Sequence, residues 1–101
     1  MTKQEIIQAI IEHNDQIKKF GINRIGLFGS YARNQQTEKS DIDIYIEFEI
    51  GKKSYDNFIG LCFYLDDLFA GKKVEVVTDA SLSPYIGPKI LSTIEYVPLA
   101  A

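Results

Sequence analysis

The sequence predicts an α/β or α+β fold, in which helices cover a small β-sheet. Stretches with apolar residues at helical spacing alternate along the chain with short stretches rich in isoleucine and valine, and glycine or polar turns separate them. The chain has 101 residues, of which 46% are hydrophobic, so we expect one domain over residues 1–101 with a modest core. These local patterns leave the relative direction of the strands open.

The first segment predicts a long helix. Thr2 and Glu5 have the spacing of a capping box, and Gly21 provides a stop after Phe20. Isoleucines recur between them at helical period, at positions 6, 7, 10, 11 and 17.

Two further helices are expected in the second half of the chain. Ser54 can cap one that ends before Gly71. Its aromatic side chains are expected in the core, with a face for a partner helix as the alternative: Phe58, Phe63, Tyr64 and Phe69. Pro88 suits the first turn of a short last helix. The residues of that helix expected to face inward are Ile90, Leu91 and Ile94. The stretch around Tyr85 is predicted to be an irregular surface loop.

Three strands are expected between these helices. Residues 23–28 and 73–78 are short apolar runs with strand character, and residues 41–48 alternate strictly between apolar and polar side chains. Residues 30–34 can form one helical turn, and a polar loop follows at 35–40. The predicted order is helix, strand, turn, strand, helix, strand, helix.

The composition argues against several classes of protein. The formal net charge of -3 disfavours an extended nucleic-acid footprint. The one cysteine, Cys62, cannot form an internal disulfide. No apolar run approaches the roughly 20 residues that span a bilayer, and the first residues do not resemble a signal peptide. We therefore expect a cytoplasmic protein that does not bind a membrane.

The strand at 41–48 carries acids where packing alone does not need them. Its isoleucines share one face, whereas Asp41 and Asp43 share the other with Tyr45 and Glu47. The two aspartates start about 7 Å apart along the strand, and each raises the pKa of the other unless a positive charge lies between them. A divalent cation such as Mg²⁺ suits such hard oxygen ligands. An ordinary solvent-exposed strand face is the alternative.

A glycine–serine corner precedes that strand. Gly29 lets the backbone approach a ligand closely, free N–H groups at the start of the next helical turn favour phosphate, and Ser30 adds a hydroxyl. Arg33 lies one turn further on. A plain tight turn is the alternative for Gly29 and Ser30 alone, but an anion cradle followed by two metal-type ligands predicts a phosphate site. Tyr31 and Tyr45 flank these residues and are candidates to contact a base.

A third acid, Glu75, interrupts the valines of the strand at 73–78. An acid within an apolar strand needs a partner. Glu75 can complete a carboxylate cluster with the two aspartates, face solvent, or pair with Lys72 or Lys73, and the sequence leaves these possibilities open.

Together these residues resemble the nucleotidyltransferase superfamily of the DNA polymerase beta type, and within it the minimal nucleotidyltransferases (MNT). The family pattern is Gly-Ser, then Ala-Arg-Gly, then Ser-Asp-x-Asp on a strand, then an acid on a later strand. Its counterparts here are Gly29-Ser30, Ala32-Arg33, Ser40-Asp41-Ile42-Asp43 and Glu75. The likeness covers nearly the whole chain. Asn34 replaces the usual glycine and Glu75 the usual aspartate; asparagine tolerates a left-handed backbone.

The resemblance implies a nucleotidyltransferase fold, a small mixed β-sheet covered by helices. It also implies an enzyme that transfers a nucleoside monophosphate, by family default AMP from ATP, to a hydroxyl. The implied catalytic residues, which would hold two Mg²⁺ ions, are Asp41, Asp43 and Glu75. Glu75 would also help to deprotonate the acceptor. The implied nucleotide-binding residues, with Arg33 on the leaving group, are Gly29, Ser30 and Arg33.

The resemblance further implies a macromolecular partner. Larger relatives carry an added domain for the acceptor, for which 101 residues leave no room. In the MNT branch the partner is commonly an all-helical HEPN protein, and the pair often works as toxin and antitoxin, in which the MNT member neutralises the HEPN ribonuclease by adenylylating a tyrosine. Two other hypotheses remain: a small-molecule nucleotidyltransferase of the antibiotic type, and a non-catalytic module that neutralises its partner by occlusion.

Overall fold

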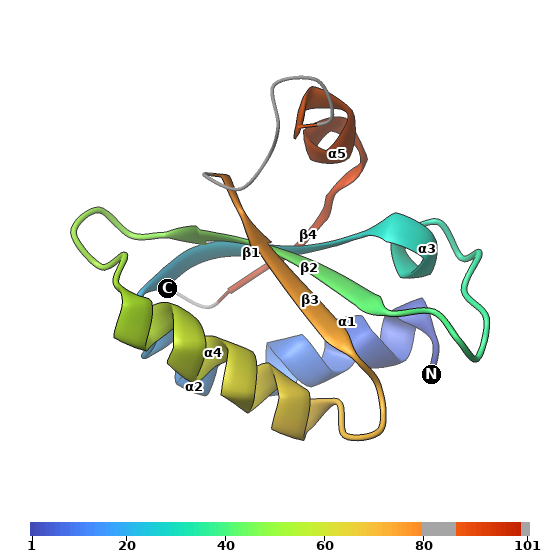
Figure 1. The fold of residues 1–101 in the computed structure, drawn as a ribbon, viewed down its shortest axis with the longest axis horizontal. Coiled ribbons are helices and arrows are strands. Elements are labelled where there is room, and N and C mark those ends of the chain that lie inside the picture. The colour runs from blue at the N-terminus through green and yellow to red at the C-terminus, as the bar shows by residue number, and fades with distance from the viewer. Residues whose placement is uncertain (80–86, 100–101) are drawn as a thin grey trace.

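The computed structural model describes residues 1–79 and 87–99, in which a sheet runs through the middle of the molecule (Figure 1). Its strands are β1 (Ile22–Phe28), β2 (Ile42–Phe48), β3 (Val74–Thr78) and β4 (Glu95–Val97). The strand order is β3-β2-β1-β4; β2 and β3 are parallel, and β1 is antiparallel to both β2 and β4. The sheet is therefore mixed, as the resemblance implied.

Helices lie on both sides of this sheet. The described ones are α1 (Lys3–Glu12), α2 (Asn14–Lys18), α3 (Gly29–Ala32), α4 (Tyr55–Leu68) and α5 (Gly87–Thr93). In Figure 1, α1, α2 and α4 lie on one side of the sheet and α5 on the other. None of the helices within the described ranges has the length and apolar character needed to cross a bilayer.

The first helix is interrupted at His13, so the prediction of one continuous helix was wrong. Its start is as predicted: Glu5 N donates to Thr2 Oγ1 at 3.2 Å, and Thr2 N donates to Glu5 Oε1 at 2.9 Å. At His13 the backbone leaves helical dihedrals, with φ -110° and ψ 19°. The His13 Nδ1 donates to the Ala9 carbonyl at 2.8 Å, and the Asn14 amide donates to another carbonyl of that turn at 2.9 Å. Side-chain hydrogen bonds to the backbone thus accompany the break.

Helix α4 begins at the predicted cap, since Asn57 N donates to Ser54 Oγ at 3.1 Å. Leu61 and Leu65 of α4 are fully buried against the sheet. Phe63 is 67% exposed, so its assignment to the core was wrong. It lies two residues from each buried leucine, roughly 200° around the helix from them. The other predicted aromatic residues lie in the core or pack against it: Phe58, Tyr64 and Phe69.

The end of the chain forms a helix and a strand, of which only the helix was predicted. Strand β4 has three residues, too few for an alternating pattern to stand out. Helix α5 contains Pro88 in its first turn, as expected. Ile90 and Ile94 are partly buried, but Leu91 is 41% exposed and its predicted inward position was wrong. Leu91 is about 100° around the helix from Ile90, which turns it away from the sheet. The predicted loop around Tyr85 lies outside the described residues.

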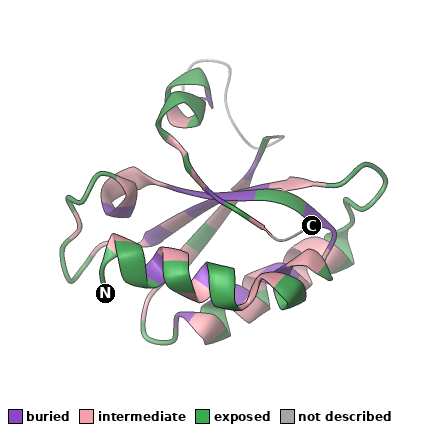
Figure 2. Cartoon of the chain, turned by 180° about the vertical axis from the view of Figure 1, so that it is seen from behind, coloured by how far each residue is buried: buried purple, intermediate pink, exposed green. Residues whose placement is uncertain are grey.

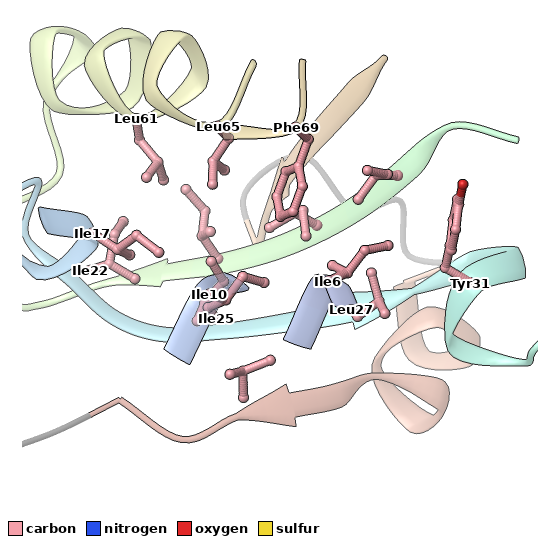
Figure 3. Packing of buried hydrophobic residues seen from close by; sticks show 14 residues of the cluster. Ile6, Ile10, Ile17, Ile22, Ile25, Leu27, Tyr31, Leu61, Leu65 and Phe69 are labelled. Carbon is pink, nitrogen blue, oxygen red and sulfur yellow. The ribbon is translucent and has the colours of Figure 1, made fainter. Parts of the chain in front are cut away.

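The hydrophobic core lies between the sheet and the layer formed by α1, α2 and α4 (Figure 3). Among its fully buried members are Ile6, Ile10, Ile17, Ile25, Leu27, Ile42, Ile44, Ile46, Leu61 and Leu65. Figure 2 shows buried residues along the strands, while the outer surface of α1 is exposed. The opposite face of the sheet, on the side of α5, therefore lies outside this layer of the core.

Strand β2 presents its acids on that opposite face, as its alternation predicted. Asp43 is the register partner of Phe28 on β1 and of Glu75 on β3. Register partners on neighbouring strands point to the same side of a sheet. Asp41 lies one residue before the first residue of β2. The register thus brings the end of β1 and two of the predicted acids to one place.

Candidate active site

The site is built around Gly29, where β1 turns into α3. Gly29 has a φ of +74°, which glycine adopts without strain. A Cβ at this position would collide with the Asp43 carboxylate, 3.0 Å from its Cγ. A side chain at position 29 would therefore displace the acid. The glycine is required here both by the turn and by the carboxylate that packs against it.

The turn after the glycine closes as the sequence predicted. Asn34 has a φ of +55°, and within the described residues it is the one non-glycine residue with a positive φ. Its N–H donates to the Tyr31 carbonyl at 3.2 Å, and Gln35 N donates to the Ser30 carbonyl at 2.9 Å. Asparagine thus accommodates the left-handed backbone at the position where the family pattern has glycine. Ser30 is partly buried beside the glycine.

The acids interact through their charges. The pKa of Asp43 is raised to about 6, first by burial, then by the negative charges of Glu75 and Asp41. Arg33 opposes this rise, which places its guanidinium within electrostatic reach of the same carboxylate. Asp43 is therefore the centre of the predicted site, with two acids and one cation around it.

Glu75 is only loosely part of this group. Its side chain is 50% exposed and pairs with Lys73 across 3.4 Å. The salt bridge that the sequence left open is thus present. Within residues 1–79 and 87–99, no three histidine, cysteine, aspartate or glutamate side chains gather closely enough to hold a metal ion. The structure brings Asp43 and Glu75 to adjacent positions without closing them into a metal cage.

The donor set nevertheless fits Mg²⁺. This ion usually takes one or two protein carboxylates together with water and substrate phosphates, and it seldom uses a cage made only of protein. Burial is the largest cause of the raised pKa of Asp43, and repulsion by Glu75 and Asp41 adds to it; a cation between the acids would relieve that repulsion.

A cavity of about 340 Å³ adjoins the glycine corner and reaches α5. Its lining residues are Phe28, Gly29, Arg33, Lys89, Ile90 and Thr93. Two of them, Gly29 and Arg33, are predicted nucleotide-binding residues. Lys89 and Thr93 were not predicted, because their helix lies far along the chain and carries no motif that signals a ligand. The volume falls within the range usual for small-ligand sites, roughly 300–1,000 Å³.

The tyrosines that flank the motif are not available to a base. Tyr31 and Tyr45 are each 1% exposed. The Tyr45 hydroxyl donates to Glu47 Oε2 at 2.8 Å, and Arg24 donates to both oxygens of Glu47 at 3.2 and 2.7 Å. The Arg24 guanidinium also lies 4.0 Å from the centre of the Tyr96 ring. This cluster covers the sheet next to Asp43 and fixes the orientation of Tyr45.

Comparison with known proteins shows the family to which the chain belongs. A family model described as the nucleotidyltransferase domain matches residues 7–97. The chain belongs to this family. The protein adenylyltransferase MntA of Thermococcus cleftensis is 37% identical over 98 residues, which cover 96% of this chain and 97% of that protein. A Methanocaldococcus jannaschii protein, provisionally named a protein adenylyltransferase, is 42% identical over 97 residues, or 95% of this chain and 98% of the relative.

Solved structures share the fold. One provisionally described as a minimal nucleotidyltransferase superposes with a TM-score of 0.76 and 29% identity, over 98% of this chain and 97% of the other. A toxin–antitoxin structure with AMP-PNP superposes with a TM-score of 0.66 and 24% identity, over 99% of this chain and 75% of the other. At this lower identity the likeness concerns the fold alone.

Proposed function

We propose that the chain is an antitoxin that transfers AMP from ATP to a tyrosine hydroxyl of a HEPN-type ribonuclease toxin. The observation that carries the proposal is the position of Asp43. It is the register partner of Glu75, its carboxylate packs against Gly29, and the positive charge of Arg33 acts on it. The curated relatives support AMP as the transferred group and a protein as the acceptor, because they are named protein adenylyltransferases.

In this proposal Asp41 and Asp43 would hold two Mg²⁺ ions, and Glu75, which pairs with Lys73 in the ligand-free chain, would be the third carboxylate ligand. Such ions neutralise phosphate charge and stabilise the attacking and leaving oxygens of an in-line displacement. The half-exposed side chain of Glu75 is free enough to exchange Lys73 for an ion, since an exposed ion pair contributes at most about 1 kcal/mol.

The transfer is an in-line displacement at the α-phosphorus. The acceptor oxygen forms a bond to the α-phosphorus, and the bond from that phosphorus to the oxygen bridging to the β-phosphate breaks. Its electron pair leaves with pyrophosphate. Glu75 accepts the hydroxyl proton and passes it to water. The Gly29 backbone and the Ser30 hydroxyl hold the β- and γ-phosphates, and Arg33 stabilises the charge of the departing pyrophosphate.

The position of the ATP label tests this proposal. The chain is incubated with Mg²⁺, a cognate HEPN protein and ATP that is radiolabelled at either the α- or the γ-phosphate. Adenylylation transfers the α-label to the partner and leaves the γ-label in pyrophosphate. The matched control is the double variant Asp66→Asn/Asp67→Asn, which removes two carboxylates at exposed positions of α4 and should transfer the label normally. Absence of the α-label from the partner would contradict the proposal.

A second function, neutralisation by occlusion without chemistry, is favoured by one observation. Glu75 is paired with Lys73, and the described residues contain no three-carboxylate group ready to bind metal. A module of this kind would bind its partner equally well without ATP. Label transfer therefore separates the two functions.

A further inference from the structure

The cavity beside the glycine corner contains a second cation that the sequence motif does not include. Lys89 and Arg33 are the two charged residues among those that line it, and no acid does. This lining is unusual in a chain whose formal net charge is -3. A cavity with two cations and no acid is suited to a polyanion.

The fold brings Lys89 and Arg33 to the same cavity from two different helices, α5 and the end of α3. Lys89 and Thr93 are four residues apart on α5, so they share one face of that helix. Arg33 ends the turn that follows β1, and α3 and α5 are in contact. The Arg33 Nε donates to Gln35 Oε1 at 3.0 Å, and this hydrogen bond orients the guanidinium. Within residues 1–79 and 87–99 neither terminal nitrogen makes a hydrogen bond, so both can donate to a ligand.

The cavity is linked to Asp43 through two of its lining residues. Gly29 lines it and also packs against the Asp43 carboxylate, and Arg33 lines it while acting electrostatically on Asp43. A phosphate bound near Asp43 would therefore have its chain of further phosphates directed into the space between Arg33 and Lys89. The three acids would offset much of the charge of any bound Mg²⁺, so additional positive groups there would stabilise a triphosphate.

We propose that Lys89 binds the leaving pyrophosphate portion of the nucleoside triphosphate, opposite Arg33. The Lys89 ammonium donates to oxygens of the β- and γ-phosphates, whereas the Thr93 hydroxyl on the same face of α5 donates to the Ile90 carbonyl at 2.9 Å. This inference rests on the proposed function, because it concerns the nucleotide of that same site. It adds α5, a helix outside the Gly-Ser and Asp-x-Asp motif, to the phosphate-binding elements.

The test measures the affinity of magnesium pyrophosphate, ATP and AMP by calorimetry for the full chain and its variants. Lys89→Gln should weaken pyrophosphate and ATP about tenfold, the size of one charge-assisted hydrogen bond, and should leave AMP unchanged. Lys89→Arg should restore most of the affinity. Lys53→Gln, an exposed lysine in the turn before α4, is the matched control and should bind all three ligands normally.

The outcomes separate this inference from the proposed function. Pyrophosphate affinity that is unchanged in Lys89→Gln, with AMP transfer by the wild-type chain intact, overturns the role of Lys89 alone. Equal loss of AMP and pyrophosphate affinity also overturns it, because it indicates a general disturbance of the site. Lys89-dependent pyrophosphate binding in a chain that transfers no AMP supports the inference and contradicts the proposed function. Thermal melting of each variant shows that it is folded.

Discussion

At the scale of single residues, Asp43 is placed at a cost to the stability of the ligand-free chain. Its pKa of about 6 in the folded chain lies above the ordinary value of 3.8, mainly because of burial and then because of Glu75 and Asp41. Between these pH values the folded chain binds a proton that the unfolded chain releases. The free energy of unfolding therefore falls as pH rises from about 4 to about 6, and the loss persists above pH 6.

We expect Asp43→Asn to remove this pH-dependent loss in the free energy of unfolding. At pH 7 and without metal, the variant should have a free energy of unfolding higher by on the order of 1 kcal/mol, after allowance for screening by solvent. At pH 4 the difference should disappear. Urea denaturation at both pH values measures it. Asp66→Asn, on the exposed side of α4, is the control for removing one carboxylate outside this group of acids. A stability difference that is the same at pH 4 and pH 7 would rule out the charge as its cause.

At the scale of secondary-structure elements, α5 is the part of the site that the sequence pattern could not place. Gly26 of β1 pairs with Tyr45 and Tyr96, and a Cβ there would collide with the side chain of Ile94, between α5 and β4. The missing side chain lets Ile94 pack directly on the strand. Close packing of the end of α5 on the sheet therefore depends on a glycine that no motif includes.

Gly26→Ala should push the end of α5 away from the sheet. We expect a destabilisation of about 1–3 kcal/mol from overpacking, together with weaker ATP binding, because Lys89 and Thr93 move with the helix. Gly60→Ala is the matched control, since a Cβ there would lie 2.8 Å from Phe20 in the opposite layer. It should destabilise the chain without a change in ATP affinity. Equal effects of the two variants on ATP affinity would argue against a role for α5.

The helices and strands also show which features local sequence patterns can predict and which they cannot. Strand β2 and the caps at Thr2 and Ser54 were predicted because alternation and capping depend on neighbouring residues. The break at His13 was missed because isoleucines continue at helical period on both sides of it, and tertiary packing decides whether such a helix continues. Strand β4 was missed because its pairing with β1 is a long-range contact that three residues cannot signal.

At the scale of the whole molecule, the sheet separates the hydrophobic core from the candidate site. The isoleucine core and α1, α2 and α4 lie on one side, while the Asp43 carboxylate and α5 lie on the other. The family resemblance implied that Asp43 and Glu75 would lie together, and the register of β2 and β3 places them side by side. The sequence left open whether Glu75 pairs with Lys73, because this pairing depends on the exposure of the two side chains and on any bound ion. In the proposed function, a partner would bring its hydroxyl to the acids on the side of the sheet that carries α5.

We propose that the chain neutralises its partner by AMP transfer, for which Asp41 and Asp43 are required, and not by occlusion. The most direct measurement is the intact mass of a cognate HEPN partner after incubation with ATP, Mg²⁺ and either the wild-type chain or Asp41→Asn/Asp43→Asn. We predict that the wild-type chain adds one or more AMP units and abolishes the ribonuclease activity, and that the double variant binds the partner but does neither. A partner of unchanged mass that is neutralised equally by both chains would contradict the account.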